Sequence, residues 1–180
     1  MQPDRRRVDG ALYMLALALA FALKRHYSLA SAEDLAWILG PTVEAVKTVT
    51  GASFVAEAGS GYLSRELYLL IAPSCAGVNF LIAAFCTGVF GLLPLTESAV
   101  GRALLVPCTA MAAYTLTVAV NTLRILVTIW GRALPTGGGW ITADQLHRIE
   151  GVTLYFLALC VSFLVARWAL LSRRSVSTSA

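Results

Sequence analysis

Long runs of apolar residues alternate with shorter polar stretches along this chain. Three runs, at residues 76–95, 103–126 and 150–171, are long enough for helices that cross a bilayer, each of which takes about 20 residues. An earlier run, at residues 10–23, is shorter. It reaches the length of a span, at residues 8–28, if the side chains of Lys24 and Arg25 extend to the membrane interface.

That first run has a second interpretation, a cleavable signal peptide. Residues 5–7 are three arginines that resemble its basic start, and Ala30-Ser31-Ala32 resembles a cleavage site. The basic group at residues 24–26 is an unusual approach to such a site, so we expect the run to be retained. Cleavage would leave the sidedness of everything after it unchanged.

Residues 29–74 do not have the composition of a span, and we expect a small extracytoplasmic cap there. Ser31 and Asp34 can cap a helix that Gly40-Pro41 interrupts, followed by a second helical stretch at residues 42–49. Residues 53–72 look like two strands of a β-hairpin around the turn Gly59-Ser60-Gly61.

The pattern as a whole predicts an all-α membrane protein. It is a multi-pass transmembrane helical bundle of about four spans, with residues 1–174 as a single integral membrane domain and 175–180 as a disordered tail. Composition agrees, because 58% of the residues are hydrophobic and only 13% are charged. The basic residues that produce the net charge of +4 flank the apolar runs, which favours the lipid bilayer as partner and predicts no nucleic acid.

The orientation does not follow from a count of basic residues. With the N-terminus in the cytoplasm, lysines and arginines divide seven to seven between the two sides. Dense basic clusters lie at both ends of the chain, at residues 5–7 and 167–174, and such clusters belong on the cytoplasmic side. We therefore expect the N-terminus inside and the cap outside.

This topology places three reactive side chains at one membrane level. Cys75 precedes the second span, Arg124 lies near the outer end of the third, and His147 precedes the fourth. The opposite orientation would move all three together to the other side. Cys86, Cys108 and Cys160 fall in the middle of spans, where a thiol is usually inert packing.

Cys75 is the candidate nucleophile. We expect it at a helix N-terminus, where free N–H groups favour the thiolate, with Ser74 as the N-cap. The amides of Ala76 and Gly77 would then be available to stabilise an oxyanion.

His147 is the candidate general acid and base, and Asp144, three residues earlier, is placed to orient its ring. Arg124 is a fixed cation for an oxyanion or a substrate carbonyl, and Asn121 shares its helical face. No cofactor or metal is predicted, because a zinc site on Cys75 and His147 lacks paired ligand spacing. A non-enzymatic membrane protein, such as a transporter subunit or assembly factor, remains the alternative, with the polar trio used in packing or ligand binding.

Three segments carry a resemblance to a known family. "APSCAGVNFLIAAF", "NTLRI" and "DQLHRIEGVTLYF" look like the signature segments of the exosortase/archaeosortase family, and the short chain is most similar to the exosortase K branch. The resemblance covers residues 54–163. Ala76 stands where a serine is common in the family, and the chain is shorter than the common eight-span exosortases.

The resemblance implies a membrane-embedded cysteine endopeptidase or transpeptidase of the bacterial inner membrane, with its site facing outward. Cys75 would be the nucleophile, Arg124 the stabiliser of the oxyanion or substrate, and His147 the acid and base. Its partners would be membrane-anchored proteins that carry a C-terminal sorting signal, made of a short motif, a transmembrane helix and a basic cluster.

Overall fold

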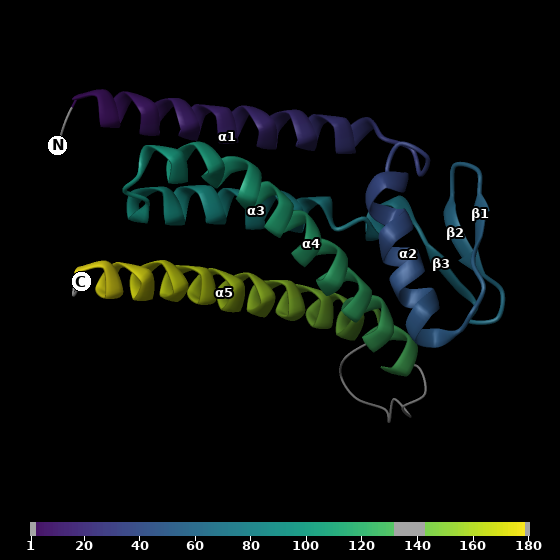
Figure 1. Cartoon of the computed structure of the whole chain (residues 1–180). Coiled ribbons are helices and arrows are strands. Elements are labelled where there is room, and N and C mark those ends of the chain that lie inside the picture. The colour runs from purple at the N-terminus through teal and green to yellow at the C-terminus, as the bar shows by residue number, and fades with distance from the viewer. Residues whose placement is uncertain (1–2, 132–142, 179–180) are drawn as a thin grey trace. The chain divides into compact units, whose positions relative to one another are not determined.

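The computed structural model describes the backbone of residues 3–131 and 143–178, and the side chains of residues 5–131, 149 and 151–172. Within these ranges the chain is mostly helical, as predicted (Figure 1). The helices are α1 (Pro3–Leu29), α2 (Ala36–Thr50), α3 (Val78–Leu92), α4 (Ala99–Gly131) and α5 (Ala143–Thr178), the strands are β1 (Val55–Glu57), β2 (Gly61–Ser64) and β3 (Leu69–Ile71), and two 3₁₀ turns are η1 (Pro73–Cys75) and η2 (Leu93–Leu95).

Among the described residues, three segments are long and apolar enough to cross a membrane. They are Pro73–Leu95, Ala99–Gly131 and Gly151–Ser172, and they contain the three longer runs of the sequence almost entirely. The expected first span, residues 8–28, lies in α1, which is a continuous helix but is not one of these three. Charged residues at both ends of α1 limit the length of its apolar part.

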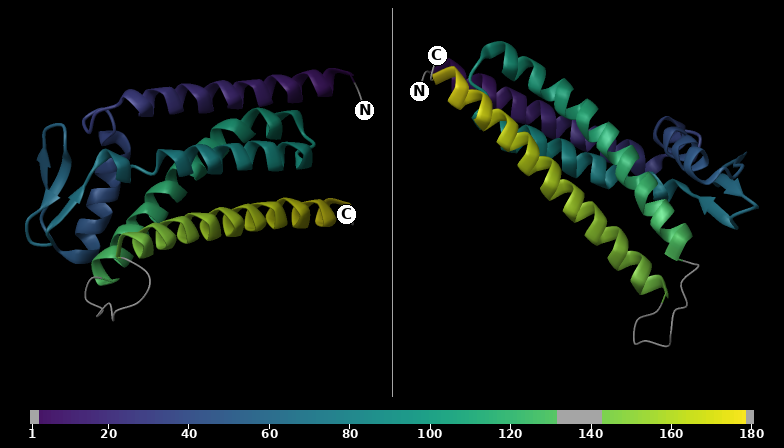
Figure 2. Two further views of the ribbon diagram at one scale, coloured as in Figure 1. Left: turned by 180° about the vertical axis from the view of Figure 1, so that it is seen from behind. Right: turned by 60° about the horizontal axis from the view of Figure 1, so that its bottom comes forward.

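The chain divides into two compact units. Unit 1 contains Met1–His26, Val78–Thr115 and Leu157–Ala180, and unit 2 contains Tyr27–Gly77 and Leu116–Phe156. In unit 1 the parts of α1, α3, α4 and α5 run alongside one another in both views of Figure 2. Small residues permit this, because the helices approach closely where glycine removes a side chain.

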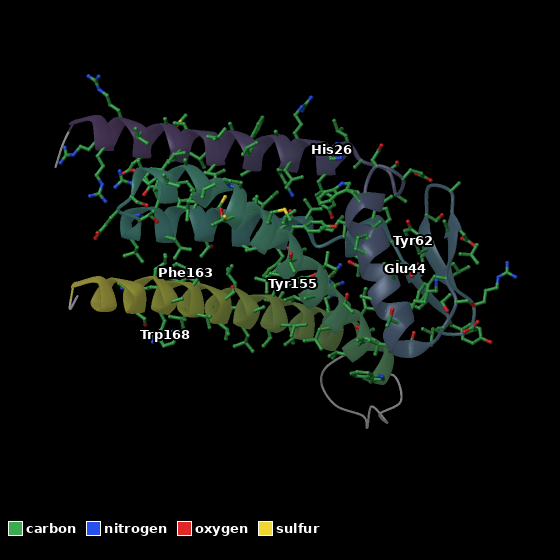
Figure 3. The ribbon with its side chains drawn as sticks, in the orientation of Figure 1. His26, Glu44, Tyr62, Tyr155, Phe163 and Trp168 are labelled. Atoms are coloured by element: carbon green, nitrogen blue, oxygen red, sulfur yellow. The ribbon has the colours of Figure 1, made fainter. Side chains whose placement is uncertain are left out.

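Two glycines of α3 show the effect within unit 1. A Cβ added at Gly88 would lie 2.9 Å from Cγ2 of Thr109 on α4, and one added at Gly91 would overlap the ring of Phe163 on α5. Figure 3 shows Phe163 on the side of α5 toward α3 and Trp168 on the opposite side, where it is exposed. α1 joins the same unit through Tyr13, whose ring stacks on that of Phe90 with centroids 4.9 Å apart.

A charged cluster lies at the start of α4 in unit 1. Arg102 is buried, and its Nε lies 3.5 Å from Oδ1 of Asp9 on α1 and donates to the carbonyl of Thr96 at 3.1 Å. Arg5 donates to the same carbonyl at 3.5 Å. A buried arginine needs such partners, because an unpaired buried charge is strongly destabilising.

Unit 2 contains a three-stranded antiparallel sheet in the order β1-β2-β3. The predicted hairpin is present as β1 and β2, which pair Val55 with Leu63 and Glu57 with Gly61 across the expected turn. The third strand, β3, was not predicted; it pairs with β2 and places Ile71 opposite Tyr62. Gly61 has a φ of 120°, and a Cβ there would overlap the carbonyl oxygen of Ile71, so only glycine fits where β2 meets β3.

α2 lies beside the sheet in unit 2 (Figure 1), and the added Cβ of Gly40 would lie 3.9 Å from the hydroxyl of Tyr62. Ser31 and Asp34 exchange hydrogen bonds of 3.0 to 3.2 Å in the turn before α2. The predicted helix cap was wrong, because the N-cap of α2 is Leu35, which makes no side-chain capping hydrogen bond. The predicted interruption at Gly40-Pro41 was wrong. α2 runs through Pro41, and it has buried apolar residues on both sides of the proline: Ile38, Leu39, Val43 and Val46.

The C-terminal end also differs from expectation. We predicted a disordered tail at residues 175–180, whereas α5 is helical as far as Thr178. Extending an existing helix fixes one residue for each hydrogen bond gained, which is far less costly than starting a new helix.

Candidate functional site

Cys75 ends the 3₁₀ turn η1 and is partly exposed. The turn begins at Pro73, whose fixed φ suits the first position of a helical turn. After Ala76, Gly77 adopts a left-handed φ of 69°, and α3 begins only at Val78. Proline before the cysteine and glycine after it therefore separate Cys75 from the α-helix that we expected it to begin.

This geometry corrects two expectations about the groups around Cys75. Ser74 makes no capping hydrogen bond, and the cap position of η1 is Ala72. The amide of Ala76 is already used, because it donates to the carbonyl of Pro73 at 3.0 Å, and the amide of Cys75 donates to Ala72 at 2.8 Å. The Ala76 amide is therefore not available to an oxyanion in this conformation, and Gly77 is the remaining one of the two amides that we named.

Asn121 of α4 contacts the cysteine directly. Its Nδ2 donates a hydrogen bond to the carbonyl oxygen of Cys75, and the Asn121 side chain is fully buried. The predicted proximity of the third span to Cys75 is thus present within unit 2.

Tyr155 of α5 connects Asn121 to Arg124 (Figure 3). The Tyr155 hydroxyl donates to Oδ1 of Asn121 at 2.8 Å and accepts from Nη1 of Arg124 at 3.0 Å. The Arg124 guanidinium carbon also lies 5.6 Å from the centroid of the same ring, a distance typical of a cation–π contact. Cys75 and Arg124 are therefore joined by one continuous hydrogen-bond chain, Arg124–Tyr155–Asn121–Cys75.

Two glycines allow the elements of this site to come together. A Cβ at Gly77 would lie 3.1 Å from Cγ2 of Thr117 and 3.5 Å from the Tyr155 hydroxyl. The aliphatic part of the Arg124 side chain lies against Gly151 on α5, where an added Cβ would lie 3.5 Å from Cδ of Arg124. The turn after Cys75 and both helices thus meet at close range, because these two positions carry no side chain.

The described part of the chain does not include the side chains of His147 and Asp144. Both residues lie in the first two turns of α5, so that His147 and Tyr155 belong to the same helix. The expected contacts of His147 with Cys75 and of Asp144 with His147 lie outside the described residues and stay predictions.

Cys86, Cys108 and Cys160 lie inside α3, α4 and α5, as expected for residues in the middle of spans. Among residues whose side chains are described, no three histidine, cysteine, aspartate or glutamate side chains are grouped so that they could hold a metal ion.

Tyr155 was not among the predicted site residues, although the sequence carries a signal for it. Thr117, Asn121, Arg124 and Thr128 repeat at the spacing of one helical face, so α4 carries a polar stripe within an apolar helix. A buried polar stripe needs hydrogen-bonding partners on a neighbouring element. Tyr155 is a polar group near the start of the last apolar run, one helical turn after Gly151, and it could have been proposed as that partner.

The chain was compared with models of protein families, with curated proteins and with solved structures, and it matches none of them.

Proposed function

We propose that this protein is a membrane-embedded cysteine endopeptidase or transpeptidase of the exosortase type. The observation that carries the proposal is the hydrogen-bond chain that joins Arg124 to the backbone of Cys75 inside unit 2. It supports the pairing of nucleophile and cation that the three sequence segments imply. The three apolar helices support a location in the membrane.

The proposed reaction begins at the thiolate of Cys75. Its sulfur forms a bond to a peptide carbonyl carbon just outside the substrate's anchor helix, and the carbonyl π electrons move onto oxygen. Arg124 stabilises this oxyanion, and collapse of the intermediate expels the amine, which takes a proton from His147. A water molecule or an acceptor amine then attacks the thioester, gives a proton to His147 and releases the thiolate.

The substrates we propose are membrane-anchored proteins with a short C-terminal motif, a transmembrane helix and a basic cluster. Enzyme and substrate would share the bacterial inner membrane, with the N-terminus of the enzyme inside and its site outside. Because both are confined to the bilayer, the scissile bond would lie at the depth of Cys75, and the reaction would gain rate from proximity.

The test is to incubate the protein in membranes with a co-expressed substrate of this kind. The wild type should cleave it through an adduct that hydroxylamine releases, as it does a thioester. The Cys75→Ala variant should show neither cleavage nor adduct. The His147→Ala variant should be severely impaired in both halves of the reaction. The Cys86→Ala variant, which removes a thiol inside α3, should behave as the wild type. Cleavage that persists in Cys75→Ala would refute the mechanism.

One observation favours the non-enzymatic alternative. The Asn121 amide forms hydrogen bonds through both its nitrogen and its oxygen, and the Tyr155 hydroxyl both donates and accepts. A purely structural contact between helices would show the same bonds. If this is their only role, Asn121→Ala should lower the thermal stability, and no anchored protein should be cleaved by the wild type.

A further inference from the structure

From the geometry of unit 2 we infer that Tyr155 is a positioning residue. It links Arg124 through Asn121 to the carbonyl of Cys75, and so holds the turn that carries the cysteine. The direction of these hydrogen bonds follows from the contacts alone, whereas their consequence for catalysis rests on the proposed function.

The direction is determined at both ends, because the guanidinium of Arg124 can only donate and the carbonyl of Cys75 can only accept. A guanidinium has only donors, so the Tyr155 oxygen must accept the bond of 3.0 Å from Nη1. The hydroxyl has a single hydrogen, which is then donated to Asn121 at 2.8 Å. The atom of Asn121 that receives it must be Oδ1, and this leaves Nδ2 to donate to the carbonyl of Cys75.

Burial makes the alternative direction costly. Asn121 is fully buried, so water cannot replace a lost partner there. A reversed Asn121 amide would place oxygen against the carbonyl oxygen of Cys75, so that two acceptors would face each other and the carbonyl would lose its donor.

The chain acts on a short segment that is already constrained on both sides. Pro73 fixes the entry to the Cys75 turn, and Gly77, with its left-handed φ, fixes the exit. The bond from Asn121 holds the carbonyl between these two points. Since Tyr155 also holds the guanidinium of Arg124, one side chain orients both the nucleophile's backbone and the cation of the proposed reaction.

Infrared spectroscopy of the Cys75 carbonyl tests the direction without a substrate. The full chain is prepared with Cys86, Cys108 and Cys160 replaced by alanine and with cysteine labelled by ¹³C at its carbonyl, so that one labelled band reports Cys75. The Asn121→Ala variant should move this band to higher frequency, because the carbonyl loses its donor. Tyr155→Phe should move it in the same direction by a smaller amount, although it keeps the ring over Arg124, because Oδ1 of Asn121 loses the hydroxyl that holds the amide in place.

Two further variants sharpen the test. Asn121→Leu keeps the approximate size of the side chain but has no donor, so it should shift the band as Asn121→Ala does. Tyr68→Phe removes a hydroxyl from a residue of unit 2 that is 89% exposed, and it should leave the band unchanged. A Tyr155→Phe band at the wild-type frequency, beside a shifted Asn121→Ala band, would overturn the inference. An unshifted Asn121→Ala band would overturn the whole chain.

Kinetics test the catalytic consequence separately. With the anchored substrate, Tyr155→Phe should lower kcat about tenfold and leave KM unchanged, as expected when a residue positions reacting groups and does not bind substrate. Unchanged kcat together with a shifted band would refute the catalytic consequence and leave the backbone role standing. A wild-type protein that cleaves nothing would refute the proposed function, and the infrared result would still decide the direction of the chain.

Discussion

Arg124 makes two different contacts with one residue. Its Nη1 donates to the hydroxyl of Tyr155, and its guanidinium plane lies near the ring of the same side chain. Both contacts depend on a planar, delocalised cation with several fixed donors, which distinguishes arginine from lysine. Charge alone therefore does not describe what this position requires.

Replacing Arg124 by lysine tests that distinction. Arg124→Lys keeps the positive charge but loses the planar fork of donors, so we expect kcat/KM for the anchored substrate to fall by about 100-fold or more. Arg65→Lys, at an exposed arginine between β2 and β3, is the matched control and should retain activity. If Arg124→Lys cleaves within about twofold of the wild type, the position supplies only charge balance.

At the scale of elements, unit 2 depends on carboxylates that bind backbone amides. Oε1 of Glu33, in the turn before α2, accepts from the amide of Gly59 in the β1–β2 turn at 2.6 Å. Glu66, after β2, accepts hydrogen bonds from the hydroxyl and the amide of Ser53. The Gly59 amide is the main cause that lowers the pKa of Glu33, and the Ser53 hydroxyl is the main cause for Glu66. These contacts tie the sheet to the segments on both sides of α2.

A lowered carboxyl pKa fixes the sign of the pH dependence. The folded state favours ionised Glu33, so its contribution to stability is complete above the ordinary glutamate pKa of about 4.3 and is lost as the pH falls through the lower, folded value. Hydrogen exchange of the Gly59 amide, relative to an unstructured peptide at the same pH, should therefore be slow at neutral pH and should accelerate in acid.

The Glu33→Gln variant should show weak Gly59 protection already at neutral pH, with little further change in acid. Glu44→Gln is the matched control, because Glu44 is exposed on α2. Its Oε1 lies 3.3 Å from Nζ of Lys47 on the same helix. Gly59 protection that is equal in Glu33→Gln and the wild type would show that the β1–β2 turn does not depend on this carboxylate.

At the scale of the whole molecule, the number of spans decides where the ends of the chain lie. If the three apolar segments each cross the bilayer, the residues before Pro73 and those after Ser172 lie on opposite sides. If α1 crosses as well, the N-terminus joins the C-terminus on one side. The basic clusters at both ends favour this second arrangement.

Thiol labelling of intact cells tests this orientation. A membrane-impermeant maleimide should label Cys75, which is partly exposed just before α3, and should leave Cys86, Cys108 and Cys160 unlabelled within the bilayer. A variant with only Cys75→Ala is the control and should lose the label. Labelling of Cys75 only after the cytoplasmic face has been opened would mean that the orientation is inverted.

The sequence by itself determined the class of protein and most of its helical segments. Apolar runs of sufficient length identify membrane helices, because the thickness of the hydrocarbon core sets a local requirement on length and hydropathy. The β1–β2 hairpin was predicted for a similar reason, since the glycines of its turn, Gly59 and Gly61, supply the backbone freedom that a tight turn needs. The approach of Cys75 and α4 was predicted from the order of the spans and from the resemblance.

Only the tertiary structure decided the detail of the site. Pro73 and Gly77 separate Cys75 from the α-helix, but the close approach of Gly77 to Thr117 and Tyr155, which are distant in sequence, appears only in the folded chain. Whether α2 continues through Pro41 depends on burial of its apolar residues on both sides of the proline, which is decided by packing. Tyr155 acquires its role in the same way, because a hydroxyl in an apolar run has no assigned partner until α5 lies beside α4 and supplies Asn121 and Arg124.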